Sequence, residues 1–434
     1  MLIYLSAKTT RTEYTFNLIF SQLLGLSYAT TTDEAVFRDH KGVKLSYRDE
    51  PVADEYFVKS SGLLFRDKII DIPVEVMKKN LQPVIFPNDG DLGFDIFSAV
   101  FYMVGRYEEY LPHPTDDHGR FKASDSFAFK NDFLHQPVVN IWIDMFQADL
   151  KRKYPDIEFR EKAFSSVVSY DIDIAYQFKG RGVLRSIGGL VKDIMIGNFS
   201  NVTARIKTLS ALQNDPWDIY NDLKNYLQQR KIKPTIFFLL ADHGDKDKNI
   251  PHRHPLMQKL IKTIQSFAEI GIHPSFTSGK DQQKIINEKQ RLEDIAGTQI
   301  IRSRQHYLRF FLPETYQYLL RAGIKEDYSM GFADMPGFRA GICTPFYFYD
   351  LQQEVATDLK VFPITIMESS LIHYMKVKPA DALNTIKQLM QQVKKVSGTF
   401  ISIWHNHTIS KTKEYIEWKA VHDQMITELI KITE

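Results

Sequence analysis

Two carboxylates at the end of an apolar run are the residues best placed to do chemistry in this sequence. The stretch FSSVVSYDIDIAY, residues 164–176, contains Asp171 and Asp173 with one isoleucine between them. Alternate side chains of a strand share a face, so both acids point into the same space if the strand continues through them. Two such carboxylates repel each other unless a cation or a proton lies between them, or each has a different partner. The pattern favours a metal ligand beside a general base, whereas helix capping would explain only one acid.

Histidines follow two other apolar runs. His273 lies in AEIGIHPSF, and His405 lies in GTFISIWHNH. A single histidine in such a position is more often a hydrogen-bonded structural residue than a ligand. Together with the paired acids, however, the two histidines indicate a site for a metal ion and for acid–base catalysis.

The elements that must position these residues lie in the second part of the chain, residues 161–434. Short apolar runs alternate there with helical segments, which predicts parallel βα units. The predicted strands are SSVVSY, PTIFFLL, EIGIHPS, IIRSRQHYL, KEDYSMGFA, VFPITIM and TFISIW. Seven such strands suit a distorted β/α barrel, whose functional residues lie at the carboxyl ends of the strands. Acids and histidines do occur at these ends: Asp171, Asp173, Asp242, His273, His306, Asp334 and His405.

Residues 177–213 interrupt this alternation and predict a basic insertion after the first strand. Six basic residues stand there against one acid, Asp193. A solvated helical face is the simpler interpretation. The alternative is a basic rim for an acidic glycan or a phosphorylated carrier.

The first part, residues 1–160, predicts a smaller α/β accessory domain. Strand-like pieces (LIYLS, GVKLSY, GLLF, PVIF) mix with helical ones (RTEYTFNLIFSQLLG, DIFSAVFYMVGRYEEYL), and the loop LPHPTDDHGRF follows them. The polar run 155–162 places the boundary near residue 160. No motif in this part indicates a reaction.

Composition excludes several classes of protein. The 55 Lys and Arg residues nearly balance the 53 Asp and Glu residues, which argues against a dedicated nucleic-acid or membrane-surface protein. The single cysteine, Cys343, excludes an internal disulfide, and it has no adjacent base that would make it a nucleophile. No apolar run is long enough to span a membrane, and the N-terminus lacks a signal-peptide pattern, so we expect a cytoplasmic protein. Dinucleotide-binding and P-loop fingerprints are absent.

In the order of these motifs, residues 164–410 resemble the NodB-homology polysaccharide deacetylases, carbohydrate esterase family 4, in the branch common in Bacteroidetes. SYDID is similar to the first motif of that family, which implies that Asp171 is the general base and Asp173 a metal ligand. EIGIH is similar to the second motif and gives His273 a metal-binding role. The resemblance also implies an accessory domain before the deacetylase domain.

The later motifs of the family have counterparts further along the chain. SRQHYL stands in the place of the third motif, with Arg304 and Tyr307 near the sugar and the base. DYSMGFAD stands in the place of the fourth, with Asp334 as its acid, and Arg339 lies in the following GFRAGICTPF, which we expect to line the site. The fifth motif is similar to Ile403-Trp404-His405, which implies that His405 is the general acid.

One position departs from the family. Its second motif usually carries another histidine four residues after the first, and Thr277, a poor zinc ligand, stands there. Zinc requires about three protein ligands and an open position. Three alternatives are open: His306 completes the set, the metal binds weakly, or no metal binds. Zinc is the first choice of ion, with cobalt or manganese as alternatives.

The resemblance implies a metal-assisted hydrolase that removes N-acetyl, or O-acetyl, groups from a polysaccharide or glycan precursor. Such a reaction activates a water, transfers its proton to a carboxylate and protonates the leaving amine from an imidazole. Two alternatives remain: a catalytically degraded carbohydrate-binding protein on the same fold, or a hydrolase of another non-peptide C–N bond. The sequence indicates neither the glycan nor the oligomeric state.

Overall fold

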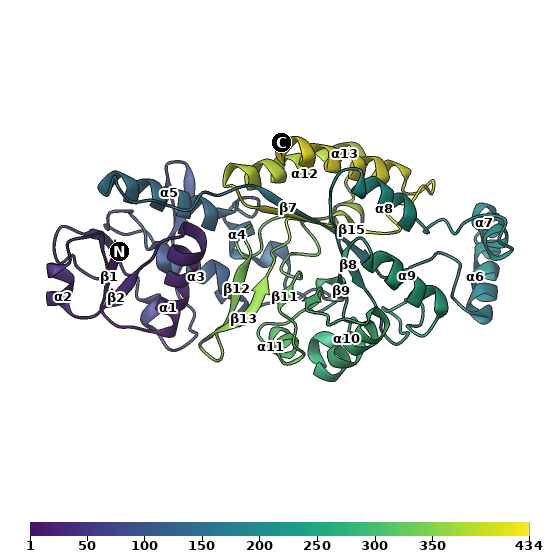
Figure 1. Ribbon diagram of the computed structural model, residues 1–434, viewed down its shortest axis with the longest axis horizontal. Coiled ribbons are helices and arrows are strands. Elements are labelled where there is room, and N and C mark those ends of the chain that lie inside the picture. The colour runs from purple at the N-terminus through teal and green to yellow at the C-terminus, as the bar shows by residue number, and fades with distance from the viewer. Residues whose placement is uncertain (434) are drawn as a thin grey trace.

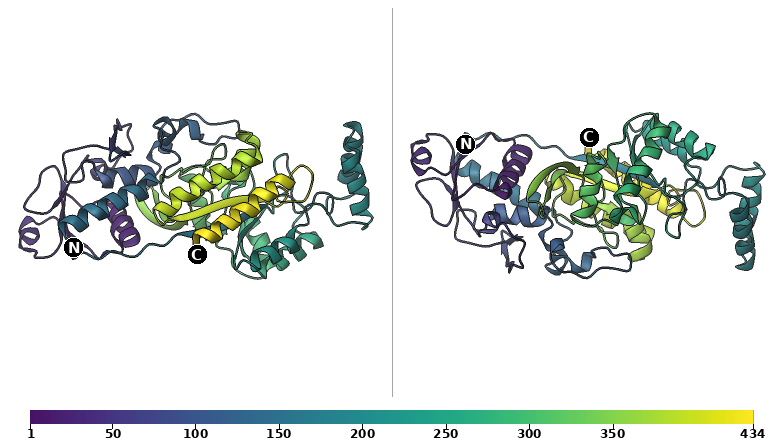
Figure 2. Two further views of the ribbon diagram at one scale, coloured as in Figure 1. Left: turned by 90° about the horizontal axis from the view of Figure 1, so that it is seen from above. Right: turned by 90° about the horizontal axis from the view of Figure 1, so that it is seen from below.

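The computed structural model describes residues 1–433 of the chain. Two main sheets lie side by side along the longest axis, one in each part of the chain, and a pair of helices stands at the far end of the second part (Figure 1). The two further views in Figure 2 show the same elongated arrangement.

The N-terminal sheet has four parallel strands in the order β2-β1-β3-β4. Its strands are β1 Leu2–Leu5, β2 Ala29–Thr31, β3 Lys44–Arg48 and β4 Tyr56–Lys59. A separate antiparallel hairpin consists of β5 Val76–Lys79 and β6 Gln82–Ile85. The accompanying helices are α1 Thr10–Phe16, which continues as a π-helical turn, α2 Glu34–Asp39, α3 Ile96–Val104, α4 Phe127–Lys130 and α5 Val138–Lys153.

The predicted strand GLLF in this part is wrong. Leu63–Phe65 forms a single 3₁₀ turn, which begins after Gly62 at a positive φ of 82°. Positive φ is readily available to glycine, and at this position it turns the chain out of β4 instead of extending it.

The larger sheet has nine strands in the order β12-β13-β11-β10-β9-β8-β7-β15-β14. All pairs are parallel except β12 with β13. The strands are β7 Ser165–Ile172, β8 Thr235–Phe238, β9 Glu269–Ile272, β10 Arg302–Ser303, β11 Glu326–Asp327, β12 Phe346–Asp350, β13 Val355–Val361, β14 Ile366–Met367 and β15 Thr399–His405. Strand β8 is buried on both faces, as expected of a parallel sheet covered by helices.

The mixed α/β fold with a mainly parallel sheet is confirmed, but the predicted barrel is not. Among residues 1–433 the strand order ends at β12 on one side and β14 on the other, so the hydrogen-bonded ladder does not close. Strands β10 and β11 have only two residues each, because most of the predicted runs IIRSRQHYL and KEDYSMGFA leaves the ladder.

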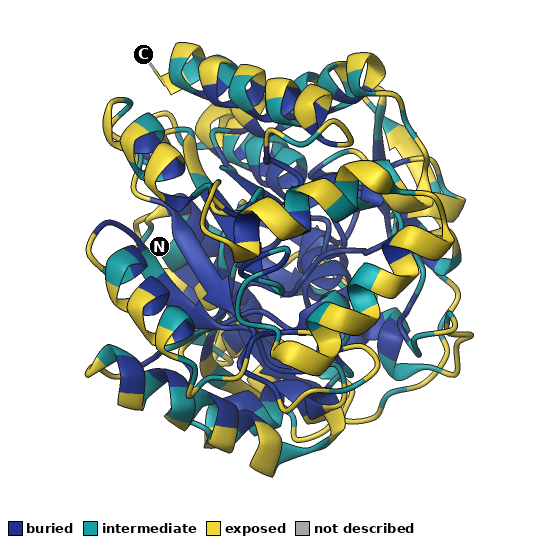
Figure 3. Cartoon of the chain, turned by 90° about the vertical axis from the view of Figure 1, so that its right-hand side faces the viewer, coloured by how far each residue is buried: buried dark blue, intermediate teal, exposed yellow. Residues whose placement is uncertain are grey.

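Helices cover this sheet and leave the buried strands at the centre of the molecule (Figure 3). They are α8 Tyr220–Gln228, α9 Pro255–Gln265, α10 Gln282–Ala296, α11 Glu314–Arg321, α12 Pro379–Lys395 and α13 Ile416–Thr433. Helix α12, for example, buries Ile386, Leu389 and Val393 at helical spacing. The predicted insertion forms α6 Val183–Met195 and α7 Phe199–Leu209. No helix among residues 1–433 has the length and hydropathy required to cross a bilayer.

Buried polar contacts join the two parts. Glu109 accepts hydrogen bonds from Arg106 and from Arg339, at 2.7 and 2.6 Å. Arg11 forms an ion pair with Glu354, and Tyr14 donates to the Tyr347 carbonyl at 2.7 Å. One continuous apolar cluster includes residues of both sheets. The domain boundary near residue 160 therefore stays a prediction, because the two parts pack against each other without a break in the apolar cluster.

Candidate functional site

The carboxyl ends of the parallel strands carry acids and histidines that meet in one cavity. Asp171 lies in β7 and Asp173 directly follows it, His273 follows β9, His306 follows β10, and His405 ends β15. These five side chains are among those that line a cavity of about 320 Å³. Parallel strands present their carboxyl ends at one edge, which explains how residues far apart in sequence come together.

The two acids of SYDID face the same space, as predicted from their alternation. Nε2 of His273 lies 3.7 Å from Oδ2 of Asp171 and 3.3 Å from Oδ1 of Asp173. Ile172, between them, is buried on the other face of β7. Neighbouring β15 keeps the same alternation, because His405 is in register with Asp171.

Asp173, His273 and His306 form a group suited to a metal ion. One ligand atom from each residue can be chosen so that all three atoms lie within 4.8 Å of one another. Nε2 of His306 is 3.5 Å from Oδ2 of Asp173. Two atoms bound to a tetrahedral zinc ion at about 2.0–2.2 Å lie roughly 3.3–3.6 Å apart, so these separations match a shared ion.

An orphaned atom supports the same conclusion. Oδ1 of Asp173 is buried and accepts no hydrogen bond from residues 1–433. Nε2 of His273 lies 3.3 Å away without donating to it, and a buried carboxylate oxygen that accepts no hydrogen bond is costly, so a cation there would satisfy it. The residues therefore fit a divalent ion.

The imidazole rings are held by partners on their far nitrogens. Nδ1 of His273 contacts the Arg304 carbonyl at 2.5 Å, and Nδ1 of His306 contacts Asp247 at 2.9 Å. Such contacts orient ligand histidines in metal sites, and here they leave Nε2 of both rings facing Asp173. Asp247 follows β8 and also accepts the Phe276 N–H at 3.0 Å.

His405 faces the group from the opposite side. Its Nε2 lies 3.6 Å from Oδ2 of Asp173, and its Nδ1 lies 2.7 Å from buried Glu368. Glu368 also accepts the His405 backbone N–H and the Thr408 hydroxyl, both at 2.8 Å. These contacts fix the plane of the ring while Nε2 stays directed into the cavity.

Charge in the cavity favours cations. Burial would raise the pKa of Asp173, but the facing His306 and His405 outweigh it and hold that pKa well below its usual range. Burial would lower the pKa of His306, but Asp173 and Asp247 raise it to about 9. Burial would also lower the pKa of His405, but Glu368 and Asp173 raise that pKa to about 10. The acids of this site therefore stabilise positive charge on whatever lies between them.

Arg304 lies behind Asp171 and not in the cavity. Its guanidinium is fully buried and donates to Oδ1 of Asp171 at 2.7 Å, to the Ser169 hydroxyl at 2.8 Å and to the Tyr328 carbonyl at 3.0 Å. Arg304 thus fixes one oxygen of Asp171 and leaves the other towards His273. Tyr307 does line the cavity.

Besides Arg304, three predicted residues do not line the cavity. Asp334 accepts the Ala123 N–H at 3.3 Å, and Arg339 donates to Glu109. Trp404 packs against His422 on the other face of β15, since it alternates with His405. The expectation that Asp334 and Arg339 line the site with the acids and histidines is therefore wrong, and Trp404 does not line the cavity either. Asp242 is exposed and pairs with Arg291 at 2.9 Å, also away from the site.

Thr277 lies outside the cavity as well. It is exposed, and its hydroxyl accepts a hydrogen bond from Lys284 at 2.7 Å. The side chain at the position of the family's usual second histidine thus points to solvent. His306 is instead the third member of the group, after Asp173 and His273. Of the three alternatives left by the sequence, this geometry favours completion by His306.

Sequence reasoning missed several residues around the cavity. Glu368 directly follows the predicted strand VFPITIM, so the rule that found the other strand-end acids could have found it. Asp247 is one of two acids in the charged run DKDK, residues 245–248, and nothing in that run distinguishes it from an ordinary surface acid. Arg120 comes from the loop LPHPTDDHGRF of the first part and lines the cavity, donating to the Tyr307 carbonyl at 2.8 Å.

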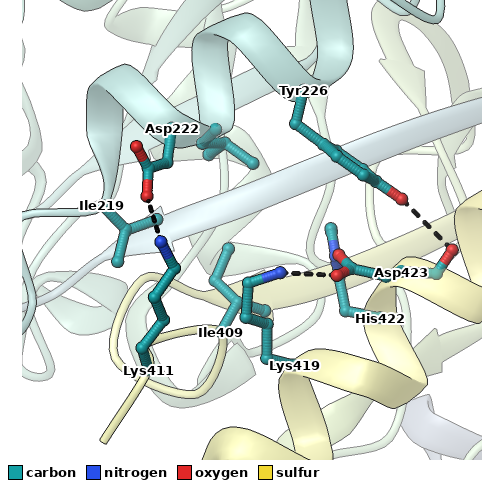
Figure 4. A pocket seen from close by; sticks show the side chains of 9 residues that line it. Ile219, Asp222, Tyr226, Ile409, Lys411, Lys419, His422 and Asp423 are labelled. Atoms are coloured by element: carbon teal, nitrogen blue, oxygen red, sulfur yellow. Dashed lines mark hydrogen bonds and ion pairs between the residues drawn. The ribbon is translucent and has the colours of Figure 1, made fainter.

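A second cavity, of about 210 Å³, lies between α8 and α13 (Figure 4). Its charged side chains pair with one another: Asp222 with Lys411 at 2.7 Å, and Asp423 with Lys419 at 2.5 Å. His422 contacts Asp423 at 3.0 Å and the Tyr170 hydroxyl at 2.8 Å. The charged groups of this second cavity are thus paired with one another, whereas the first cavity gathers the acids and histidines of the strand ends.

Comparison with known proteins gives partial matches. A family of unknown function, DUF7033, matches residues 1–155. No curated protein matches the chain. A protein from Mycobacterium smegmatis assigned as a polysaccharide deacetylase is similar in structure, with a TM-score of 0.41, 12% identity, and coverage of 62% of this chain and 85% of the other.

Two further solved structures show weaker similarity. The polysaccharide deacetylase Bc1974 from Bacillus cereus has a TM-score of 0.31 and 14% identity, over 62% of this chain and 88% of the other. A CE4 family pseudoenzyme from Bacillus anthracis has a TM-score of 0.31 and 10% identity, over 62% of this chain and 61% of the other. Two of these three solved structures are named polysaccharide deacetylases and the third a pseudoenzyme of the CE4 family, while the Bacteroidetes type stays a prediction. Similarity at this level identifies neither substrate nor reaction.

Proposed function

We propose that this chain is a metal-assisted hydrolase that removes acetyl groups from a polysaccharide or glycan precursor. One observation carries the proposal: Asp173, His273 and His306 gather within 4.8 Å, with Asp171 and His405 lining the same cavity. A metal-ligand group beside a carboxylate and an imidazole is the set that hydrolysis of an amide requires.

In this proposal Asp173, His273 and His306 hold a divalent ion, with zinc as the first choice and cobalt or manganese as alternatives. When bound, the ion supplies Lewis-acid activation of water and of the acyl oxygen. Three protein ligands leave an open position, as catalytic zinc sites do.

The chain's own residues move the protons. Asp171, fixed through Oδ1 by Arg304, accepts a proton from the attacking water. His405, kept in its charged form by Glu368, gives a proton to the leaving amine from Nε2. The products are acetate and the free amino sugar, or the free alcohol if the group is an O-acetyl.

Tyr307, Tyr374 and Arg120 form a wall of the cavity. Aromatic rings of this kind provide stacking faces for a sugar. The substrate is therefore proposed to be a glycan, and the acyl group acetyl, because the cavity is small.

The test is elemental analysis of the purified protein beside acetate release from a panel of N- and O-acetylated sugars. The proposal expects one bound divalent ion per chain and acetate from at least one sugar. Release of ammonia or of another acyl product, without acetate, would favour a hydrolase of a different C–N bond. Glycan binding without any product would favour a binding protein on the same fold.

A further inference from the structure

Helices α6 and α7 form a hairpin that stands apart from the rest of the molecule in Figure 1 and in both views of Figure 2. The ion pair between Asp193 and Arg205, at 2.7 Å, joins the two helices. Asp215 closes the base of the hairpin, because its carboxylate accepts the N–H groups of Gln177, Phe178 and Lys179 at 2.7–3.1 Å. The hairpin is thus a defined element with a fixed base.

One face of α6 is apolar and uncovered. Six apolar side chains of this helix are each at least 48% exposed: Val183, Leu184, Ile187, Val191, Ile194 and Met195. At 100° per residue they fall within about one third of the helix circumference. Helix α7 adds Phe199, Ile206 and Leu209 at helical spacing. Exposed apolar residues elsewhere in residues 1–433 are scattered, so this is a patch of the kind that marks an interaction site.

Five cations belong to the hairpin or to the segment that leads into it, and on α6 they fall outside the apolar third of the circumference. Lys179, Arg181, Arg185, Lys192 and Lys207 form no ion pair with any residue of 1–433, and the one acid of the hairpin is already paired with Arg205. Basic and acidic residues nearly balance over the whole chain, but residues 177–213 hold six basic residues and one acid. A second copy of the hairpin would bring like charges together, which disfavours self-association through this face.

We propose that the α6–α7 hairpin docks on the surface of an anionic lipid bilayer. A large apolar face with lysine and arginine beside it is the pattern of helices that lie in the bilayer interface without crossing it. The cations contribute by attraction to anionic headgroups. The proposal does not depend on the proposed function. If both hold, the cavity lies near the surface, because the base of the hairpin begins at Gln177, four residues after Asp173.

The experiment is sedimentation of the full chain with vesicles of pure phosphatidylcholine or of equimolar phosphatidylcholine and phosphatidylglycerol. Binding to the mixed vesicles is expected, with little or none to the neutral ones. The double variant Leu184→Glu, Ile187→Glu should weaken binding at least tenfold, because each change places a charge in the apolar face. The double variant Lys192→Gln, Lys207→Gln keeps that face and should weaken binding about fivefold for each cation removed.

The matched control is Met77→Glu, Leu81→Glu, which adds the same charges to exposed apolar positions of the β5–β6 hairpin. This control should bind as the wild type does. Equal melting temperatures show that the variants fold, and acetate release from a soluble sugar should be unchanged in all of them. Loss of binding in the control, or equal binding to neutral and anionic vesicles, overturns the proposal. So does an absence of vesicle binding together with a dimer that the Leu184→Glu, Ile187→Glu variant dissociates, which would make a second copy the occupant.

Discussion

At the scale of single residues, His306 decides whether the site has three ligands or two. Replacing it with alanine should lower bound zinc from one ion per chain to a small fraction, because Asp173 and His273 alone are a weak zinc site. The matched variant is Thr277→His, which installs the histidine usual in the resembling family. Thr277 is exposed and bound to Lys284, so this change should leave metal content as it is. Tighter zinc binding in Thr277→His, measured by competition with a chelator, would show that the ligand set has been misassigned.

Asp247 and Glu368, the carboxylates that contact Nδ1 of His306 and of His405, should have opposite effects on metal binding and on catalysis. Asp247→Asn should weaken zinc affinity by about 10–100-fold and leave kcat at saturating zinc nearly unchanged, because Asp247 orients a ligand. Glu368→Gln should do the reverse, lowering kcat by about 10–100-fold at unchanged zinc affinity, because Glu368 holds the proposed acid His405. Zinc titration and steady-state kinetics on both variants separate the two roles. The same phenotype in both would contradict the division of the site into ligands and acid.

At the scale of elements, the sequence predicted which strand-end side chains meet in one cavity better than it predicted the open sheet that carries them. Polar residues after apolar runs marked Asp171, Asp173, His273, His306 and His405, and parallel strands bring such positions to one edge. The same rule wrongly included Asp242 and Asp334, because a strand end specifies an edge and not a side-chain direction. Trp404 was assigned through its neighbour His405, although alternation along β15 turns it to the other face.

The loop LPHPTDDHGRF is an element whose role only the structure shows. Arg120 reaches from it into the second part and donates to Asp116, to the Tyr307 carbonyl and to the Tyr374 hydroxyl, at 2.8–2.9 Å. No periodicity in the sequence reports such a contact, because it joins residues 187 positions apart.

We expect Arg120→Ala to raise KM for the acetylated sugar about tenfold, since a charged hydrogen bond that holds the cavity wall is worth roughly 1.5 kcal/mol. Metal content should not change, because Arg120 touches none of the proposed ligands. Arg38→Ala is the control, since Arg38 forms an exposed pair with Glu34 in α2. Steady-state kinetics and elemental analysis of both variants test this, and an unchanged KM in Arg120→Ala would remove the loop from the substrate site.

At the scale of the whole molecule, Glu109 links the two parts through charge. Burial would raise its pKa, but Arg339 and Arg106 lower it from 4.5 to about 2. The folded-state pKa is depressed, so the stability contributed by Glu109 is present above pH 4.5 and is lost as the pH falls from 4.5 towards 2.

Glu109→Gln should therefore destabilise the protein by about 3–5 kcal/mol at neutral pH, because buried Arg339 loses its carboxylate partner and Arg106 keeps only Glu108. It should also flatten the loss of stability below pH 4.5. Urea unfolding at several pH values measures both effects. Glu34→Gln, at an exposed ion pair, should change stability by less than about 0.5 kcal/mol. Equal effects in the two variants would mean that the Glu109 cluster does not hold the parts together.

The most direct test of the central claim is acetate release by wild-type protein and Asp171→Asn, each loaded with zinc and checked for metal content. The account predicts acetate from an N- or O-acetylated sugar with the wild type. Asp171→Asn should retain the metal while its rate falls by about 10²–10⁴-fold, the usual contribution of a positioned general base. A wild-type protein that holds zinc but releases no acetate, and on which Asp171→Asn has no effect, would contradict the claim.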